Sequence, residues 1–160
     1  TSHVGKAQAG KATFHKDTPQ IFAATNIPYV ATVAESNPTD FIKKAAKAQK
    51  YANEYGLAFI KALSACPLNW NDNPRYERSV IDAAVNCCYH PLYEIEEGIT
   101  TITYNPEERN KKIPVIDWLK MMGRTKHLAK PEYADIVQSI QDEVDRRWER
   151  LKARHESPVL

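Results

Sequence analysis

A strand, a helix and a second strand follow one another in the first half of the chain, and this pattern constrains the fold most. Residues 26–36, NIPYVATVAES, are β-branched and aromatic in their middle, as in a buried strand. Residues 37–55 repeat apolar side chains at helical spacing, and Gly56 is placed to end that helix. The apolar positions are Phe41, Ile42, Ala45, Ala48 and Ala52. Residues 57–63, LAFIKAL, indicate a second buried strand. Such a unit almost always has parallel strands and a right-handed crossover, so the predicted fold class is α/β.

The middle of the chain predicts a helix, a hairpin and a short helix. Residues 75–88 place apolar side chains on one helical face, with Cys88 among them. Residues 91–104 alternate in polarity and carry a Glu-Gly turn, which is typical of a β-hairpin. Residues 113–123 indicate a short helix that a glycine stops.

The last predicted helix, residues 131–154, is long and amphipathic. Its apolar stripe must lie on a surface, either of this domain or of a partner subunit. The opposite face is densely charged, and its lysines and arginines are interpreted as solvated or as subunit contacts. The stripe consists of Tyr133, Ile136, Val137, Ile140, Val144, Trp148 and Leu151.

Length and composition favour one globular domain. The chain has 160 residues, of which 42% are apolar, and no apolar run approaches the roughly 20 residues needed to cross a bilayer. The net charge of +2 gives no argument for binding nucleic acid or a membrane, so a soluble, cytoplasmic protein is expected. We divide the chain into a loop at 1–20, a strand–helix–strand and helix core at 21–90, and a hairpin with a helical extension at 91–160.

The chain begins at Thr1 in a polar stretch without apolar periodicity. We interpret it as the later part of a longer protein or as a processed product. Gly5 and Gly10 resemble a phosphate-binding loop only loosely, because no strand precedes them and no G-K-[ST] follows. A loop that faces solvent or a partner is the favoured interpretation.

Cys66 directly follows the second predicted strand, in the sequence SACPLNW. The carboxyl ends of parallel strands are where open α/β sheets bind ligands. Pro67 fixes its own φ and so stiffens the turn that carries the thiol. A thiolate on a rigid loop suits a metal ion or an iron–sulfur cluster, although most lone cysteines are buried and inert.

A zinc site built from Cys66, Cys87, Cys88 and His90 is an alternative that the spacing disfavours. Tetrahedral zinc sites draw on pairs of ligands two to four residues apart. Cys87 and Cys88 are adjacent on a predicted helix and would point about 100° apart. Three cysteines are an odd number, so a disulfide framework is not expected either. A reducing compartment or a metal centre explains them better.

Several segments together resemble the β subunit of the 2-oxoacid:ferredoxin oxidoreductases, the pyruvate synthase family. Residues 27–48, IPYVATVAESNPTDFIKKAAKA, resemble the strand and helix of that family, and ALSACPLNW resembles its strand followed by A-P-C-P-T-G-W. AVNCCYHPLYEIEEG resembles its A-V-E-T-G-x-x-P-L-Y-E segment, and MMGRTKHL its late G-R-x-K-H-L. The order and spacing agree over roughly residues 24–148.

This resemblance implies the C-terminal part of a thiamine-diphosphate-binding parallel-sheet domain. It also implies Mg²⁺ and a [4Fe–4S] cluster, with most of their ligands outside this chain. Cys66 falls at the position of a cluster ligand, and Thr1 and Ser2 fall where the family's N-T-G loop lies near thiamine diphosphate. The implied reaction is oxidative decarboxylation of a small 2-oxoacid, with electrons passed to the cluster and to ferredoxin. The implied partners are the other subunits of an anaerobic enzyme complex, and the participation of coenzyme A is left open.

The sequence also departs from the family pattern. Leu68 and Asn69 stand where family proteins have T-G after the Cys-Pro pair, and residues 86–88, Asn-Cys-Cys, replace E-T-G. These departures leave the substrate open between pyruvate, oxalate and another small oxoacid. A second hypothesis is a non-catalytic α/β module that docks a partner through its C-terminal helix.

Overall fold

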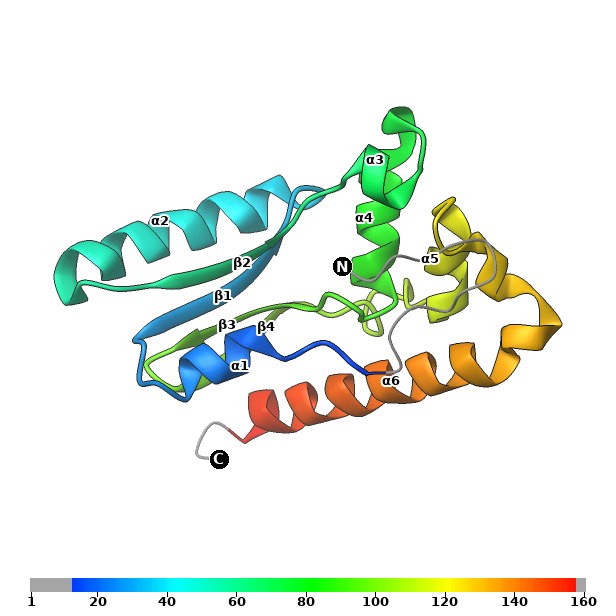
Figure 1. Ribbon diagram of the computed structural model, residues 1–160. Helices are drawn as coiled ribbons and strands as arrows, with labels where there is room; N and C mark the ends of the chain where they lie inside the picture. The colour runs from blue at the N-terminus through cyan, green and yellow to red at the C-terminus, as the bar shows by residue number, and fades with distance from the viewer. Residues whose placement is uncertain (1–12, 158–160) are drawn as a thin grey trace.

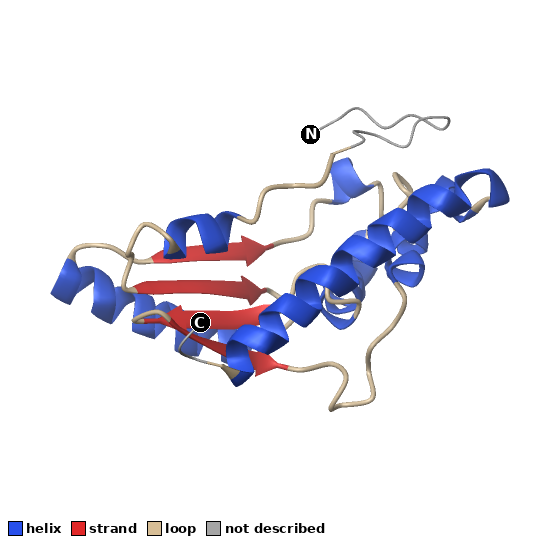
Figure 2. Cartoon of the chain, turned by 90° about the horizontal axis from the view of Figure 1, so that it is seen from below, coloured by secondary structure: helices blue, strands red, loops and turns tan. Residues whose placement is uncertain are grey.

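The computed structural model describes residues 13–157, and their strands form one mixed sheet (Figure 2). The strands are β1 (Tyr29–Ala34), β2 (Phe59–Leu63), β3 (Leu92–Glu96) and β4 (Ile99–Tyr104). They lie in the order β2-β1-β3-β4. β1 and β2 run parallel, whereas β3 is antiparallel to β1 and β4 is antiparallel to β3. The α/β class and the parallel pair β1 and β2 are confirmed. The parallel-sheet domain that the resemblance implies is seen here as a mixed sheet, because the hairpin strands join it antiparallel to β1.

The connections explain why only the first pair of strands is parallel. Helix α2 (Pro38–Tyr55) carries the chain back along the sheet, so β2 points the same way as β1. The next helices are α3 (Pro67–Trp70), η1 (Pro74–Tyr76) and α4 (Glu77–Asn86). They stay beyond the carboxyl end of β2 (Figure 1), so β3 starts at that end and runs in the opposite direction.

The predicted hairpin is confirmed as β3 and β4. Glu97 and Gly98 join the two strands, with φ values of 50° and 85°. Both values lie in the left-handed region, as a two-residue turn of the I′ type requires. This turn makes the second half of the sheet antiparallel.

Helix α2 covers one face of the sheet, and only part of its predicted apolar stripe faces inward, with Ala48 packed on the core. Ile42 is 67% exposed, and the buried residues are Tyr51 and Lys44. The Lys44 ammonium lies 2.8 Å from the Asp40 carboxylate and 2.9 Å from the carbonyl oxygen of Thr32. These partners allow a cation to be buried where an apolar residue was expected. Burial lowers the pKa of Lys44.

The opposite face of the sheet carries α1 (Thr18–Ala23) and α6 (Ala134–Glu156), with α4 and α5 (Val115–Met121) at one end (Figure 1). The sequence predicted no helix at α1. Short turns η2 (Lys126–Ala129) and η3 (Pro131–Tyr133) lead from α5 into α6. None of the helices within 13–157 combines the length and apolar character of a membrane span.

The long amphipathic helix is confirmed, and its stripe packs on this domain. Val144, Trp148 and Leu151 are buried in the main core cluster, and Trp148 has no exposed surface. The stripe is less covered toward the start of α6, where Val137 is half-buried and Ile136 is 37% exposed. The second half of the helix therefore carries most of the contact.

Strand β2 is half-buried, although its sequence predicts a fully buried strand. All six residues of β1 are buried, whereas those of β2 are half-buried or exposed. Within residues 13–157 β2 pairs with β1 alone, so it lies at the edge of the sheet. An apolar edge strand of this kind is a surface on which further structure can pair.

The position of Trp148 predicts that α6 is part of the folding core. Trp148→Ala should lower the free energy of unfolding by about 3–5 kcal/mol, because it leaves a large cavity. Ile136→Ala, on the exposed part of the same stripe, should cost less than about 1 kcal/mol. Urea denaturation of both variants checks this. Equal small losses would contradict the packing and would mean that the stripe serves a partner instead.

Candidate functional site

Cys66 lies on an exposed turn at the carboxyl end of β2. It caps the amino end of α3, and Pro67 is the first residue of that helix. The thiol side chain is exposed, and Leu68 beside it is 95% exposed. The turn therefore presents a free thiol together with an uncovered apolar side chain, as expected for a residue that faces a group or a chain outside residues 13–157.

A second segment, distant in sequence, fixes the backbone of this turn. The backbone N–H of Gly123 donates to the carbonyl oxygen of Asn71 over 3.1 Å, and that of Arg124 donates to Trp70 over 3.1 Å. A side-chain hydrogen bond joins the Arg124 guanidinium to Asn69. A Cβ at Gly123 would collide with the Asn71 carbonyl oxygen, so glycine allows this close approach. The fold thus brings together the segments SACPLNW and MMGRTKHL.

Asp72 follows this turn, and its carboxylate forms no hydrogen bond with the described residues. Both of its carboxylate oxygens are buried, and neither has a hydrogen-bond partner within residues 13–157. Lys120 and Lys126 line the same surface hollow without forming a bond to it. A buried carboxylate without a partner is costly, so the end of β2 holds an unsatisfied polar group close to Cys66.

The other cysteines and His90 lie away from Cys66, inside the core. Burial raises the pKa of the Cys87 and Cys88 thiols to about 12, so both are protonated at neutral pH. Helix α4 ends at Asn86, and Cys88 takes a left-handed φ of 61° instead of the predicted helical position. Within the described part of the chain no three His, Cys, Asp or Glu side chains are placed to hold one metal ion.

His90 is buried beneath β1. Its Nε2 atom lies 3.0 Å from the carbonyl oxygen of Val33. Burial lowers the pKa of His90 to about 4, and this outweighs the hydrogen bond to Val33, which raises it. The ring is therefore neutral at pH 7 and donates one hydrogen bond. It acts there as a packed core residue.

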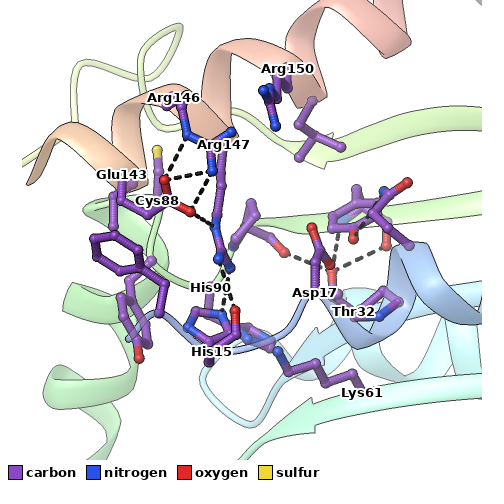
Figure 3. Close-up of a pocket in the computed structure, with 18 of the residues that line it drawn as sticks. His15, Asp17, Thr32, Lys61, Cys88, His90, Glu143, Arg146, Arg147 and Arg150 are labelled. Carbon is purple, nitrogen blue, oxygen red and sulfur yellow. Dashed lines mark hydrogen bonds and ion pairs between the residues drawn. The ribbon is translucent and has the colours of Figure 1, made fainter. Parts of the chain in front are cut away.

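A cavity of about 280 Å³ opens between α6, α1 and the sheet (Figure 3). Arg147 reaches from α6 toward His15, and Lys61 approaches from β2 (Figure 3). The other charged residues of its wall are Asp17, Glu143, Arg146, Arg150 and Arg154. Cationic side chains outnumber carboxylates, so the cavity has a positive potential.

Arg147 links α6 to the segment that precedes α1. Its Nε donates to Glu143 over 2.6 Å, and its Nη2 donates to the carbonyl oxygen of His15 over 2.8 Å. The His15 ring lies against Tyr89, with 5.4 Å between the ring centroids. Burial first, and the Arg147 charge second, lower the pKa of His15. His15 therefore contributes little positive charge at neutral pH.

Sequence reasoning did not identify this cavity. It interpreted the arginines of α6 as solvated or as subunit contacts, and it assigned His15 and Lys61 no role. A usable signal is present in DRRWERLKAR, where Arg146, Arg150 and Arg154 recur at four-residue spacing and so share one side of a helix. The partners from β2 and from the start of the chain depend on the tertiary fold.

The predicted thiamine-diphosphate contacts Thr1 and Ser2 lie outside the described residues. The predicted metal ligand Cys66 is described, and it lies exposed on a turn at the carboxyl end of the parallel strand β2. Cys66 does not line the cavity of Figure 3.

Comparisons with known proteins give similarity across most of the chain. No protein-family model matches. The pyruvate synthase subunit PorB of Thermotoga maritima is 38% identical over 94% of this chain and 45% of its own length. PorB of Methanocaldococcus jannaschii is 36% identical over 94% of this chain and 47% of its own. The ketoisovalerate oxidoreductase subunit VorB of Pyrococcus horikoshii is 35% identical over 92% of this chain and 45% of its own. The chain spans about half the length of these relatives.

The buried His90 predicts a loss of stability in mild acid. The unfolded chain protonates this ring near pH 6.5, whereas the folded chain does so only near pH 4. The free energy of unfolding should fall as pH drops through this window, by up to about 1.4 kcal/mol for each pH unit. Urea denaturation between pH 7 and 4 checks this. His90→Gln should remove that part of the slope, and His155→Gln, at an exposed site, should retain it. Parallel curves for wild type and His90→Gln would contradict the assignment.

Because the Asp72 carboxylate has no hydrogen-bond partner within residues 13–157, a neutral side chain at this position should make the folded chain more stable. Asp72→Asn should raise the free energy of unfolding of this chain by about 1 kcal/mol, because it removes a buried charge. Asp82→Asn, at a half-buried position on α4, serves as the control and should change it little. Chemical denaturation at pH 7 measures both. A loss of stability in Asp72→Asn would contradict the cost assigned to this carboxylate.

Proposed function

Because this chain is homologous to about half of the β subunit of 2-oxoacid:ferredoxin oxidoreductases, we propose that it serves as that part of such an enzyme. The proposed reaction is oxidative decarboxylation of a small 2-oxoacid, with electrons passed through a [4Fe–4S] cluster to ferredoxin. The relatives carry the names of pyruvate synthase and ketoisovalerate oxidoreductase, so pyruvate is the first substrate to test and oxalate the second. One observation carries the proposal: an exposed thiol on a fixed turn, within a chain of this homology.

Cys66 fits the role of one cluster ligand. A cluster of this type is held by thiolates, and it accepts and releases single electrons when bound. Cys66 is the one exposed thiol within residues 13–157, while Cys87 and Cys88 are buried and protonated. The described residues can therefore supply one cluster ligand at most. The remaining ligands must come from the rest of the enzyme.

The turn around Cys66 limits the movement of its thiol. Pro67 restricts the backbone on one side, and the hydrogen bonds from Gly123 and Arg124 hold the other side of α3. Trp70 packs edge-on against Trp118, with 6.4 Å between the ring centroids. A ligand on a backbone fixed in this way would hold a bound group at a defined position.

Thiamine diphosphate, with Mg²⁺, supplies the carbon nucleophile of this chemistry when it is bound. Thr1 and Ser2 remain the proposed contacts to it. The half-buried edge strand β2 is consistent with a larger sheet in which further strands pair beside it. The other proposed partners are additional subunits, and a cytoplasmic location follows from the proposed reaction with ferredoxin.

The alternative of a docking module is not favoured. That hypothesis requires the apolar stripe of α6 to be available to a partner. The structure uses Val144, Trp148 and Leu151 of this stripe in the core of the chain itself. The part that stays accessible, around Ile136, is too small to form a stable interface alone.

Cys66→Ser in the assembled enzyme tests the proposed function. It should remove or destabilise one cluster, so iron content falls by about four atoms per cluster and the EPR signal of the reduced cluster is lost or altered. Cys87→Ala removes a buried thiol and should leave both unchanged. Iron analysis, visible absorption and EPR give the readout. Unchanged iron and EPR in Cys66→Ser would refute the ligand assignment, and a colourless native complex would favour the docking module.

A further inference from the structure

The cavity between α6, α1 and β2 contains more positive charge than its own carboxylates can neutralise. Its wall contains Lys61 and four arginines of α6, but only two carboxylates, Asp17 and Glu143. We propose that this cavity binds the phosphate group of a small phosphate monoester. The arginines involved are Arg146, Arg147, Arg150 and Arg154.

Two of these arginines already share one carboxylate. Glu143 accepts from Arg146 and from Arg147, each over 2.6 Å. Three further cations, the half-buried Lys61 and the exposed Arg150 and Arg154, form no side-chain ion pair or hydrogen bond with residues 13–157. They are the groups whose charge a bound anion would balance.

Lys61 adds evidence from burial. It lies on β2, half-buried, and faces the cavity with Arg147 nearby (Figure 3). Burial lowers its pKa, Asp17 raises it, and the charge of Arg147 lowers it again. Asp17 offsets part of the cost of burying this ammonium, and an anion in the cavity would offset more of it. Lys61 from β2 and the arginines of α6 line the same cavity.

The chemistry of the wall selects the class of anion. Guanidinium groups bind phosphate oxygens in a bidentate manner, and several of them together favour a dianion over a single carboxylate. Phe14, Tyr89 and Tyr93 provide aromatic surface beside the cations. A volume of about 280 Å³ accommodates a phosphate with a small organic group, and it is too small for a dinucleotide or a comparable cofactor.

The proposed phosphate site is separate from Cys66. Cys66 does not line the cavity, and the cationic residues are absent from the turn that carries the thiol. The site could therefore be real even if Cys66 holds no cluster, and the cluster assignment could hold if the site is absent. An acidic segment of another subunit is the competing occupant, and the experiment must separate it from a small molecule.

The test uses the assembled enzyme and two phosphate probes, inorganic phosphate and phenyl phosphate. Isothermal titration is run at constant ionic strength, with chloride as the compensating anion. Saturable binding is expected, with phenyl phosphate tighter than phosphate because its ring contacts the aromatic wall. Arg150→Gln/Arg154→Gln should weaken binding at least tenfold. Lys43→Gln/Arg75→Gln removes the same charge from exposed positions outside the cavity wall and should leave affinity unchanged.

Three outcomes would overturn the proposal. One is the absence of saturable binding by the wild-type enzyme. Another is an equal loss in both double variants, which would show a general charge effect. The third is a cross-link or a structure that places a carboxylate of another subunit in the cavity. If Arg150→Gln/Arg154→Gln fails to assemble, Lys61→Gln replaces it, with the same expected tenfold loss and with Lys43→Gln as its control.

Discussion

The fold depends on strand β1, which is covered on every side. Its six residues are all buried, β2 pairs with one edge and β3 with the other. Helix α2 covers one face and the core beneath α6 covers the other. Since its backbone groups are paired along both edges, β1 fixes the positions of its neighbours. The end of β2, where Cys66 lies, is therefore placed by a strand that itself cannot shift without breaking the core.

The turn at Cys66 joins parts of the chain that are remote in sequence. Helix α3 alone is too short to be stable, and it is held through backbone hydrogen bonds from Gly123 and Arg124. Glycine at position 123 permits the close approach. The backbone that carries the thiol is thus held by tertiary contacts, although Cys66 itself is exposed. Exposure together with rigidity distinguishes Cys66 from the buried Cys87 and Cys88.

The charged residues around the sheet differ in whether they have partners of opposite charge. Lys44 is buried with its own oxygen partners, and it stabilises the packing of α2. Within residues 13–157, the cations that surround the cavity of Figure 3 lack such partners, apart from the pair that shares Glu143. The Asp72 carboxylate, near the end of β2, also has no hydrogen-bond partner among these residues. An unpaired charge is expensive where it is buried, as at the Asp72 oxygens and at the half-buried Lys61.

Several features followed from local sequence alone. The period of the apolar residues identified β1, α2, the hairpin and α6, because each pattern is decided by neighbours in sequence. The resemblance to a known family also needed only the sequence, and relatives of 36% and 38% identity confirm it. The features that local sequence did not reveal share one cause. The burial of Lys44 depends on oxygen partners that the apolar pattern of α2 does not reveal. The antiparallel position of β3 beside β1 depends on the path of α3 and α4.

What the sequence determined by itself is the set of elements and the presence of one thiol after a strand. Tertiary structure decided the direction of β3, the edge position of β2 and the burial of Cys87, Cys88 and His90. It also brought Lys61 and His15 beside the arginines of α6. The physical reason is that local patterns depend on residues a few positions apart. Burial and charge pairing depend instead on which distant segments meet.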